Sequence, residues 1–156
     1  MERFTRLIKI LKDASIDFVI VGGFAAVLHG GSQVTQDLDV CIEFNPENIQ
    51  KLRFCLKDYH PVHRMTPNKL SFLDHPSDVS TLKNLYLKTD IGILDLLGLV
   101  GGVGEFKELN RSAIDIELFQ VRCKIISVED LICAKKFMGR PKDLFTVREL
   151  ECLGKT

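Results

Sequence analysis

The chain has 156 residues with 21 basic and 21 acidic side chains, so its formal net charge is zero. Hydrophobic residues make up 46% of it and charged residues 27%, which excludes a disordered or fibrous protein. A protein that coats nucleic acid would carry surplus Lys and Arg, so the balanced charge argues against binding by bulk charge. The length suffices for one domain with a buried core.

We expect neither a targeting segment nor a membrane span. The longest apolar run without charge, Leu96 to Gly104, is too short and too rich in glycine to cross a bilayer. The five cysteines form no CxxC pair, which argues against a disulfide framework or a thiolate zinc site. Buried free thiols in a reducing compartment are the simpler interpretation, so the sequence predicts a cytoplasmic protein.

The first third of the chain predicts helix, strand, helix and strand in that order. Apolar residues recur at helical spacing from Phe4 to Leu11, which indicates an amphipathic helix. Asp17–Val21 predicts a short buried strand that ends at Gly22-Gly23, and Phe24–His29 favours a second helix. From Leu38 to Phe44 apolar and polar residues alternate, which is typical of a strand.

The middle of the chain alternates clear patterns with an irregular segment. Asn45-Pro46 begins a helix with a cap residue followed by proline at the first helical position. Periodicity is absent between His60 and Thr81, which predicts a loop or an irregular hairpin around residues 70–73. Two strands, a glycine-rich turn and a short helix are expected next, at Leu85–Leu87, Ile91–Leu97, Gly98–Gly104 and Glu105–Leu109.

The last third predicts a pair of strands and two closing helices. The strands are Ile114–Leu118 and Val121–Ile126, and Ser127 begins a capping box that opens a helix to about Met138. A last helix is expected over Lys142–Leu153. No linker or internal repeat is evident, so we expect a single α/β domain over residues 1–156. Its small, mostly antiparallel mixed sheet would be flanked by helices, with those of about residues 128–153 packed on it.

Two aspartates follow a glycine turn at a short distance along the chain. Gly22 and Gly23 end a strand and lead into a helix, where backbone N–H groups can approach an anion closely. After 13 further residues come Asp37 and Asp39, whose carboxylates point to the same face of a strand while the apolar residues beside them face the core. Such carboxylates repel each other unless a positive charge lies between them, and Mg²⁺ prefers oxygen ligands of this kind.

A third carboxylate fits the same site. Asp95 lies within an otherwise apolar strand, where a charge is costly unless it is paired or binds metal. Asp90, which follows Thr89 at a turn, ranks below Asp95 for this role. Phosphate-binding glycines together with three strand-borne carboxylates describe a two-metal site for phosphoryl or nucleotidyl transfer.

The block from Gly22 to Asp39 resembles the signature of nucleotidyltransferases of the DNA polymerase β superfamily, in which a pair of small residues precedes an acidic-apolar-acidic strand. Within that superfamily it is most similar to small stand-alone members and to toxin-type members of abortive-infection systems. The resemblance extends from about Phe18 to Leu150. Gln33 stands where the family often has a basic residue, and Gly23 stands where it often has serine.

The resemblance implies a minimal polymerase-β-like nucleotidyltransferase fold and a set of site residues. Asp37, Asp39 and Asp95 would be catalytic and would ligate Mg²⁺, with two ions present when an NTP is bound. An acceptor hydroxyl, activated with the help of Asp95, would attack the α-phosphorus, and pyrophosphate would leave. The residues that would contact the nucleotide are Gly22, Gly23, Ser32, Thr35, Lys135 and Arg140.

Several interpretations remain open at this point. The basic residues between Lys135 and Arg148 are either a solvated helix face or a contact to the triphosphate. The function that the resemblance implies is Mg²⁺-dependent transfer of a nucleoside monophosphate from an NTP to a hydroxyl of a small molecule, a protein or RNA. The alternatives are a non-catalytic nucleotide-binding module, such as a toxin–antitoxin component, and a Mg²⁺-dependent phosphohydrolase. The expected protein partner is a second copy of the chain or an antitoxin-like protein.

Overall fold

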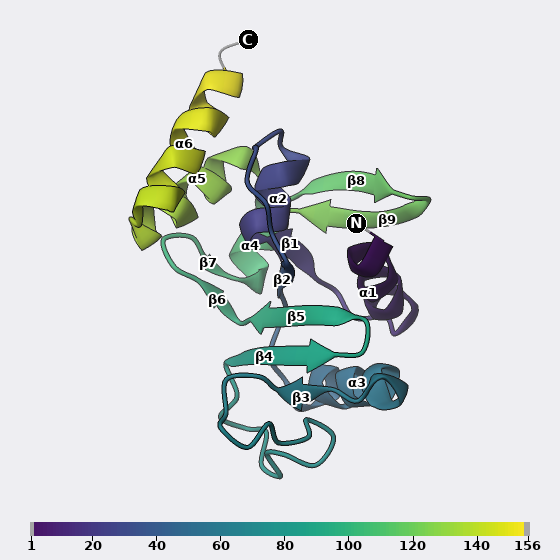
Figure 1. Cartoon of the computed structure of the whole chain (residues 1–156). Coiled ribbons are helices and arrows are strands. Elements are labelled where there is room, and N and C mark those ends of the chain that lie inside the picture. The colour runs from purple at the N-terminus through teal and green to yellow at the C-terminus, as the bar shows by residue number, and fades with distance from the viewer. Residues whose placement is uncertain (1, 155–156) are drawn as a thin grey trace.

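The computed structural model describes residues 2–154, which form a seven-stranded sheet and six α-helices (Figure 1). The strand order is β3-β4-β5-β2-β1-β9-β8. Four neighbouring strand pairs are antiparallel, whereas β2–β5 and β1–β9 are parallel, which confirms the expected mixed, mostly antiparallel sheet. The strands of this sheet are β1 (Val19–Val21), β2 (Asp37–Cys41), β3 (Val62–His63), β4 (Asn84–Thr89), β5 (Gly92–Leu97), β8 (Ile114–Leu118) and β9 (Val121–Ile125).

The helices lie around this sheet, and the last two form a pair at one end of the molecule (Figure 1). In that pair α5 packs against α6, and α5 also contacts α2. None of the helices within residues 2–154 has the length and the apolar character needed to cross a lipid bilayer. The helices are α1 (Glu2–Asp13), α2 (Gly22–Leu28), α3 (Pro46–Leu56), α4 (Phe106–Ser112), α5 (Val128–Met138) and α6 (Pro141–Leu153), with a 3-10 turn at Lys57–Tyr59.

The helix ends follow the local signals of the sequence. The Asn45 side chain accepts a hydrogen bond from the backbone N–H of Asn48, and Pro46 occupies the first turn of α3. Ser127 accepts in the same way from the N–H of Asp130 at the start of α5. Gly139 ends α5 in the left-handed conformation, with φ of 67°, which glycine adopts without steric cost.

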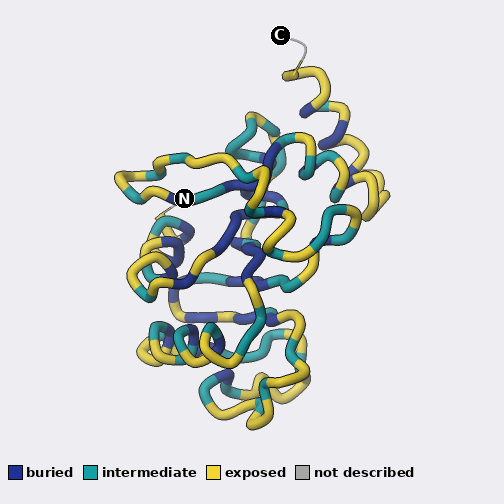
Figure 2. Tube along the Cα trace, turned by 180° about the vertical axis from the view of Figure 1, so that it is seen from behind, coloured by how far each residue is buried: buried dark blue, intermediate teal, exposed yellow. Residues whose placement is uncertain are grey.

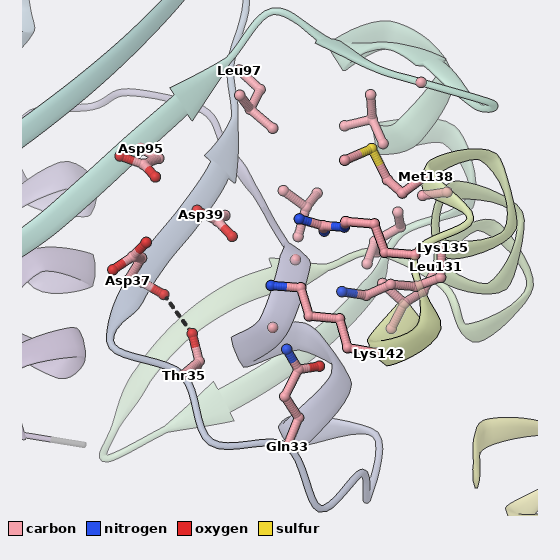
Figure 3. Close-up of a pocket in the computed structure, with 18 of the residues that line it drawn as sticks. Gln33, Thr35, Asp37, Asp39, Asp95, Leu97, Leu131, Lys135, Met138 and Lys142 are labelled. Atoms are coloured by element: carbon pink, nitrogen blue, oxygen red, sulfur yellow. Dashed lines mark hydrogen bonds between the residues drawn. The ribbon is translucent and has the colours of Figure 1, made fainter. Parts of the chain in front are cut away.

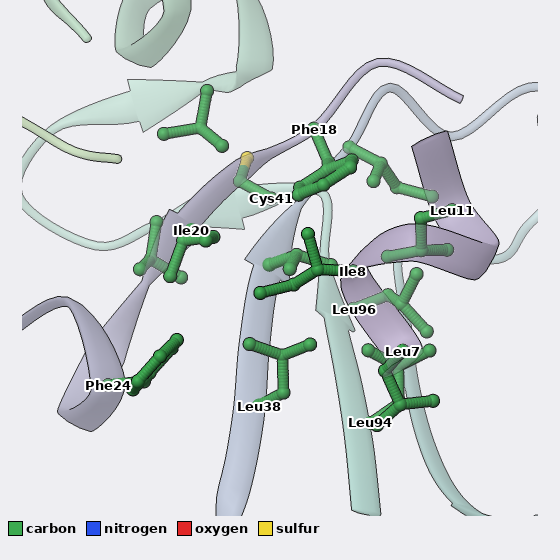
Figure 4. Close-up of a cluster of buried hydrophobic side chains, with 14 of the residues drawn as sticks. Leu7, Ile8, Leu11, Phe18, Ile20, Phe24, Leu38, Cys41, Leu94 and Leu96 are labelled. Carbon is green, nitrogen blue, oxygen red and sulfur yellow. The ribbon is translucent and has the colours of Figure 1, made fainter. Parts of the chain in front are cut away.

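The hydrophobic core lies where α1 packs against the central strands (Figure 4). Leu7, Ile8 and Leu11 of α1 are fully buried, as the sequence periodicity predicts. Leu38 of β2 and Leu94 of β5 lie in the same cluster and are also fully buried. Figure 2 shows that burial is concentrated in the central strands, while most of the loop after β3 is intermediate or exposed and the outer side of α6 is exposed.

The structure differs from the sequence-based expectation in three segments. Helix α2 begins at Gly22 rather than at Phe24, so the glycines form its first turn. The irregular segment after His60 contains β3, whose pairing with β4 the sequence did not indicate, whereas its bridge from Val62 to Ser71 agrees with the hairpin expected around residues 70–73. The glycine-rich turn carries a small hairpin of β6 (Leu99–Val100) and β7 (Gly104–Glu105). Strands of two residues are too short for a periodic pattern, so the sequence could not indicate them.

Candidate functional site

The pairing of β2 with β5 brings the three predicted carboxylates together. Asp39 lies directly opposite Asp95 in a parallel register, and Asp37 precedes Asp39 by two residues on the same face. Figure 3 shows the three side chains on one side of a cavity. Asp90, the other candidate for the third carboxylate, lies elsewhere, because its carboxylate contacts His60 at 2.6 Å.

The opposite face of these strands fixes the direction of the carboxylates. Leu38 and Val40 alternate with the aspartates on β2 and are fully buried, as are Leu94 and Leu96 beside Asp95. A shift of the register by one residue would bury the carboxylates and expose these apolar side chains. The hydrophobic core therefore determines which face of the sheet carries the charges.

Gly22 allows the backbone to approach Asp39 closely. Its φ is +68°, and a Cβ at this position would lie 2.1 Å from Oδ2 of Asp39. Gly23 is also crowded, because a Cβ there would lie 3.0 Å from the Thr35 side chain. Both glycines line the cavity at the start of α2, where backbone N–H groups attract anions.

Of the two residues in the loop before β2 that were predicted to contact the nucleotide, one lines the cavity and the other does not. Thr35 and Gln33 line the cavity, and the Thr35 hydroxyl donates to the Asp37 carbonyl at 3.1 Å. Ser32 is not among the described residues that line it. The Ser32 hydroxyl instead donates to Glu149 of α6 at 2.6 Å, because this part of the loop runs along α6. The structure thus brings Thr35, but not Ser32, to the predicted site.

The basic residues of α5 and α6 form the opposite side of the cavity. Lys135, Arg140 and Lys142 line it, and Figure 3 shows Lys135 and Lys142 across from the aspartates. The fully buried Asp143 holds two of these cations: its carboxylate accepts from Nε of Arg140 at 2.6 Å and lies 3.5 Å from Nζ of Lys135. Burial opposes ionisation, but the pairs with Arg140 and Lys135 lower the pKa of Asp143.

Arg64 is a site residue that the sequence did not indicate. Its Nε donates to Asp95 Oδ1 at 3.1 Å, its Nη2 donates to Asp95 Oδ2 at 2.5 Å, and Nη2 lies 3.8 Å from Asp37 Oδ2. The available signal was the expected need for a positive charge between the carboxylates. The irregular segment between His60 and Thr81 has two Lys or Arg residues, Arg64 and Lys69, so a permanently charged cation from that segment has to be one of these two.

The pKa values of two of the aspartates are raised in the folded protein. Burial, together with the negative charges of Asp95 and Asp37, raises the pKa of Asp39 to about 7, although Lys135 and Arg64 act in the opposite direction. Burial also raises the pKa of Asp95, against the effect of its hydrogen bonds with Arg64. An added cation near Asp37 and Asp39 would therefore be strongly favoured.

The donor set fits one metal ion better than a shared pair. Asp37 and Asp39 offer carboxylate oxygens to the cavity, which suits a hard divalent cation. Asp95 is already held by Arg64, and residues 2–154 contain no group of three or more His, Cys, Asp or Glu side chains arranged to hold a metal ion. The expectation that all three aspartates ligate metal stays a prediction, and in the described structure Asp95 is paired with Arg64.

The cavity between the carboxylates and the basic residues has a volume of about 580 Å³, which is in the range of pockets that bind small molecules. One wall offers oxygen ligands and the other offers cations and helix N–H groups. Such an arrangement is able to bind a polyphosphate with a divalent cation.

Comparison with solved structures identifies the fold. LnuA, a lincosamide antibiotic adenylyltransferase solved with lincomycin bound, aligns with a TM-score of 0.64 at 15% identity, covering 98% of this chain and 97% of its own. ANT(2″)-Ia in complex with adenylyl-2″-tobramycin aligns with a TM-score of 0.61 at 15% identity, covering 100% and 91%. A Thermotoga maritima protein with a provisional assignment as a nucleotidyltransferase gives a TM-score of 0.57 at 18% identity, covering 93% and 88%.

The chain has a nucleotidyltransferase fold. This confirms the fold expected from the glycine pair and the acidic strand. No protein-family model and no curated protein sequence matches the chain, so the nucleotidyltransferase fold is recognised from the course of the backbone.

Gly22→Ala tests the close approach of backbone and carboxylate. Alanine would have to adopt a positive φ and displace Asp39, so we expect the free energy of unfolding to fall by about 1–3 kcal/mol in urea titrations. Gly154→Ala is the control, because Gly154 ends α6 at φ of −68° and a Cβ added there would lie 3.6 Å from its nearest neighbouring atom. Equal losses in the two variants would contradict the assignment of Gly22.

Asp39→Asn tests whether the ionised Asp39 carboxylate destabilises the folded protein. Because the pKa of Asp39 is raised to about 7, the folded state holds a proton that the unfolded state releases from about pH 4 upward, so ionising Asp39 destabilises the fold as the pH rises through 7. The variant should therefore raise the melting temperature without metal by several degrees at pH 8.5, and by less at pH 5. A gain that is independent of pH would contradict this explanation.

Asp143→Asn tests the support of the basic wall. The variant leaves the buried Lys135 without its carboxylate, which we expect to cost about 3 kcal/mol and to lower the melting temperature by about 6–12 °C. Glu151→Gln breaks the exposed pair with Lys136 and should change the melting temperature by no more than about 2 °C. Similar values for both variants would show that Asp143 does not hold the wall.

Proposed function

We propose that the protein transfers a nucleoside monophosphate from an NTP to a hydroxyl group of a small molecule, with release of pyrophosphate and with Mg²⁺ as the metal. The observation that carries the proposal is a cavity with Asp37, Asp39 and Asp95 on one wall and three basic side chains on the other, within a nucleotidyltransferase fold.

The triphosphate would lie against the basic wall. Lys135, Arg140 and Lys142 provide positive charge, and the N–H groups at Gly22 and Gly23 lie at the start of α2 in the same cavity. Because Asp143 fixes Arg140 and Lys135 before the nucleotide binds, little side-chain entropy would be lost on binding. The hydrogen bond from the Thr35 hydroxyl to the Asp37 carbonyl would keep this end of the loop in place.

Asp37 and Asp39 would hold the metal ion. When bound, Mg²⁺ supplies positive charge that neutralises phosphate oxygens and polarises the α-phosphorus. The two carboxylates come from one strand whose reverse face is buried, so their positions are fixed before any ligand arrives.

The acceptor would approach from the β4–β5 side. Asp95 faces the cavity there, and Tyr86 and Leu97 line the same region. The Asp95 carboxylate would orient the attacking hydroxyl and accept its proton, as the hydroxyl oxygen bonds to the α-phosphorus and the bond to the pyrophosphate leaving group breaks. We favour a small molecule over a protein or RNA because LnuA was solved with lincomycin and ANT(2″)-Ia with an adenylylated tobramycin.

The test is incubation of the protein with Mg²⁺, an α-labelled NTP and a panel of hydroxyl compounds that includes lincomycin and tobramycin. We expect a labelled product and pyrophosphate, and a loss of at least about 100-fold in rate for Asp37→Asn. Asp90→Asn is the matched control, because Asp90 contacts His60 outside the cavity, and it should retain the wild-type rate.

Other outcomes would support the alternatives. Release of inorganic phosphate without an acceptor would support a phosphohydrolase. NTP binding in calorimetry without pyrophosphate release, in a cell extract as well as with the panel, would support a non-catalytic binding module. Either result would overturn the proposed transfer.

A further inference from the structure

Arg64 contacts the carboxylate cluster from a loop that the proposed reaction does not otherwise use. Its guanidinium forms two hydrogen bonds with Asp95, at 3.1 and 2.5 Å, one to each carboxylate oxygen. The same Nη2 lies 3.8 Å from Oδ2 of Asp37. The positive charge of Arg64 therefore lies between Asp95 and Asp37.

The position of Arg64 is built into the fold. Its backbone N–H donates to the Tyr86 carbonyl at 3.0 Å, and Tyr86 lies directly opposite Asp95 on β4 and β5. The guanidinium carbon lies 5.6 Å from the centre of the Tyr86 ring, in the geometry of a cation–π contact. The Arg64 carbonyl accepts a hydrogen bond from Lys69 at 2.5 Å, so both the backbone and the head group are held.

This arrangement leaves one lone pair free on each Asp95 oxygen but places the positive charge of Arg64 beside both oxygens. Both Asp95 oxygens accept from Arg64, and the Asp95 side chain is only 8% exposed. An ion shared between Asp95 and Asp37 would have to displace a bidentate arginine or lie beside its positive charge. Within residues 2–154, Asp39 forms no such hydrogen-bonded pair with an arginine, and Asp37 has only the longer contact.

We propose that Arg64 acts as a tethered cation in place of a second metal ion. The protein holds one divalent ion with Asp37 and Asp39, and Arg64 keeps Asp95 from ligating another. Arg64 is thus a positioning residue that holds Asp95 toward the acceptor. The inference rests on the proposed function only in that the divalent ion binds at these aspartates, and it replaces the two ions expected from the sequence.

The experiment is a titration of the full-length protein with Mn²⁺ alone, followed by calorimetry and by electron paramagnetic resonance of the free ion. We expect one site in the wild type, which Asp37→Asn weakens and Asp95→Asn leaves intact. Arg64→Gln should add a second site or tighten binding by about tenfold or more, as removal of a like charge at this distance predicts. Combining Arg64→Gln with Asp95→Asn should restore a single site.

Two further variants separate a loss of folding and a general charge effect from the proposed role. Arg64→Lys keeps the charge and should keep one site, and circular dichroism should show that the variants remain folded. Lys88→Gln removes a positive charge from the exposed part of β4 and should not change the number of sites.

The outcomes for Arg64 and for the proposed function are distinguishable. Two sites in the wild type, no Mn²⁺ binding at all, or unchanged binding in a folded Arg64→Gln variant would overturn the role of Arg64, whatever the transfer assay gives. A single Mn²⁺ site in the wild type, with a second site or tighter binding in Arg64→Gln, would support the role of Arg64. If the same protein released no pyrophosphate from any NTP, the proposed function would be overturned and the role of Arg64 would remain.

Discussion

The parallel pairing of β2 with β5 is the constraint on which the rest of the site depends. It places Asp39 opposite Asp95 and keeps Asp37 on the same face, so three like charges share a small volume. The repulsion contributes to the raised pKa of Asp39, about 7. The arrangement persists because the reverse face of both strands is anchored in the hydrophobic core, and a slip of register would cost more than the repulsion.

Basic side chains from the neighbouring elements partly neutralise the three aspartates. Arg64 reaches the cluster from the β3 side, and Lys135 approaches it from α5. The basic wall needs its own support, which the buried Asp143 provides through Arg140 and Lys135. Opposite charges therefore alternate from Arg64 through the aspartates to the basic wall and Asp143, with the cavity between the aspartates and the wall.

A site of this kind lowers the stability of the folded protein without a cation and raises its affinity for one. Carboxylates that repel one another in the folded state bind a cation more tightly, because the cation removes the repulsion. The neutral overall charge of the chain conceals this, since acidic and basic groups cancel in the sum but are separated across one cavity. The glycine with positive φ at the start of α2 belongs to the same site, because only a residue without Cβ allows Asp39 to lie so close to the backbone.

The sequence by itself determined the features that depend on local pattern. The helix caps at Asn45 and Ser127, the buried face of α1 and the alternation around Asp37 and Asp39 were all legible, because each depends on neighbours within a few residues. Only the tertiary structure decided the strand partners, the diversion of Ser32 to Glu149 and the position of Arg64. Arg64 and Asp95 are 31 residues apart in the sequence. Strand β4 connects them in space, but no pattern in the sequence distinguishes Arg64 from other basic residues. Contacts of this kind follow from strand order and packing, which a single sequence leaves open.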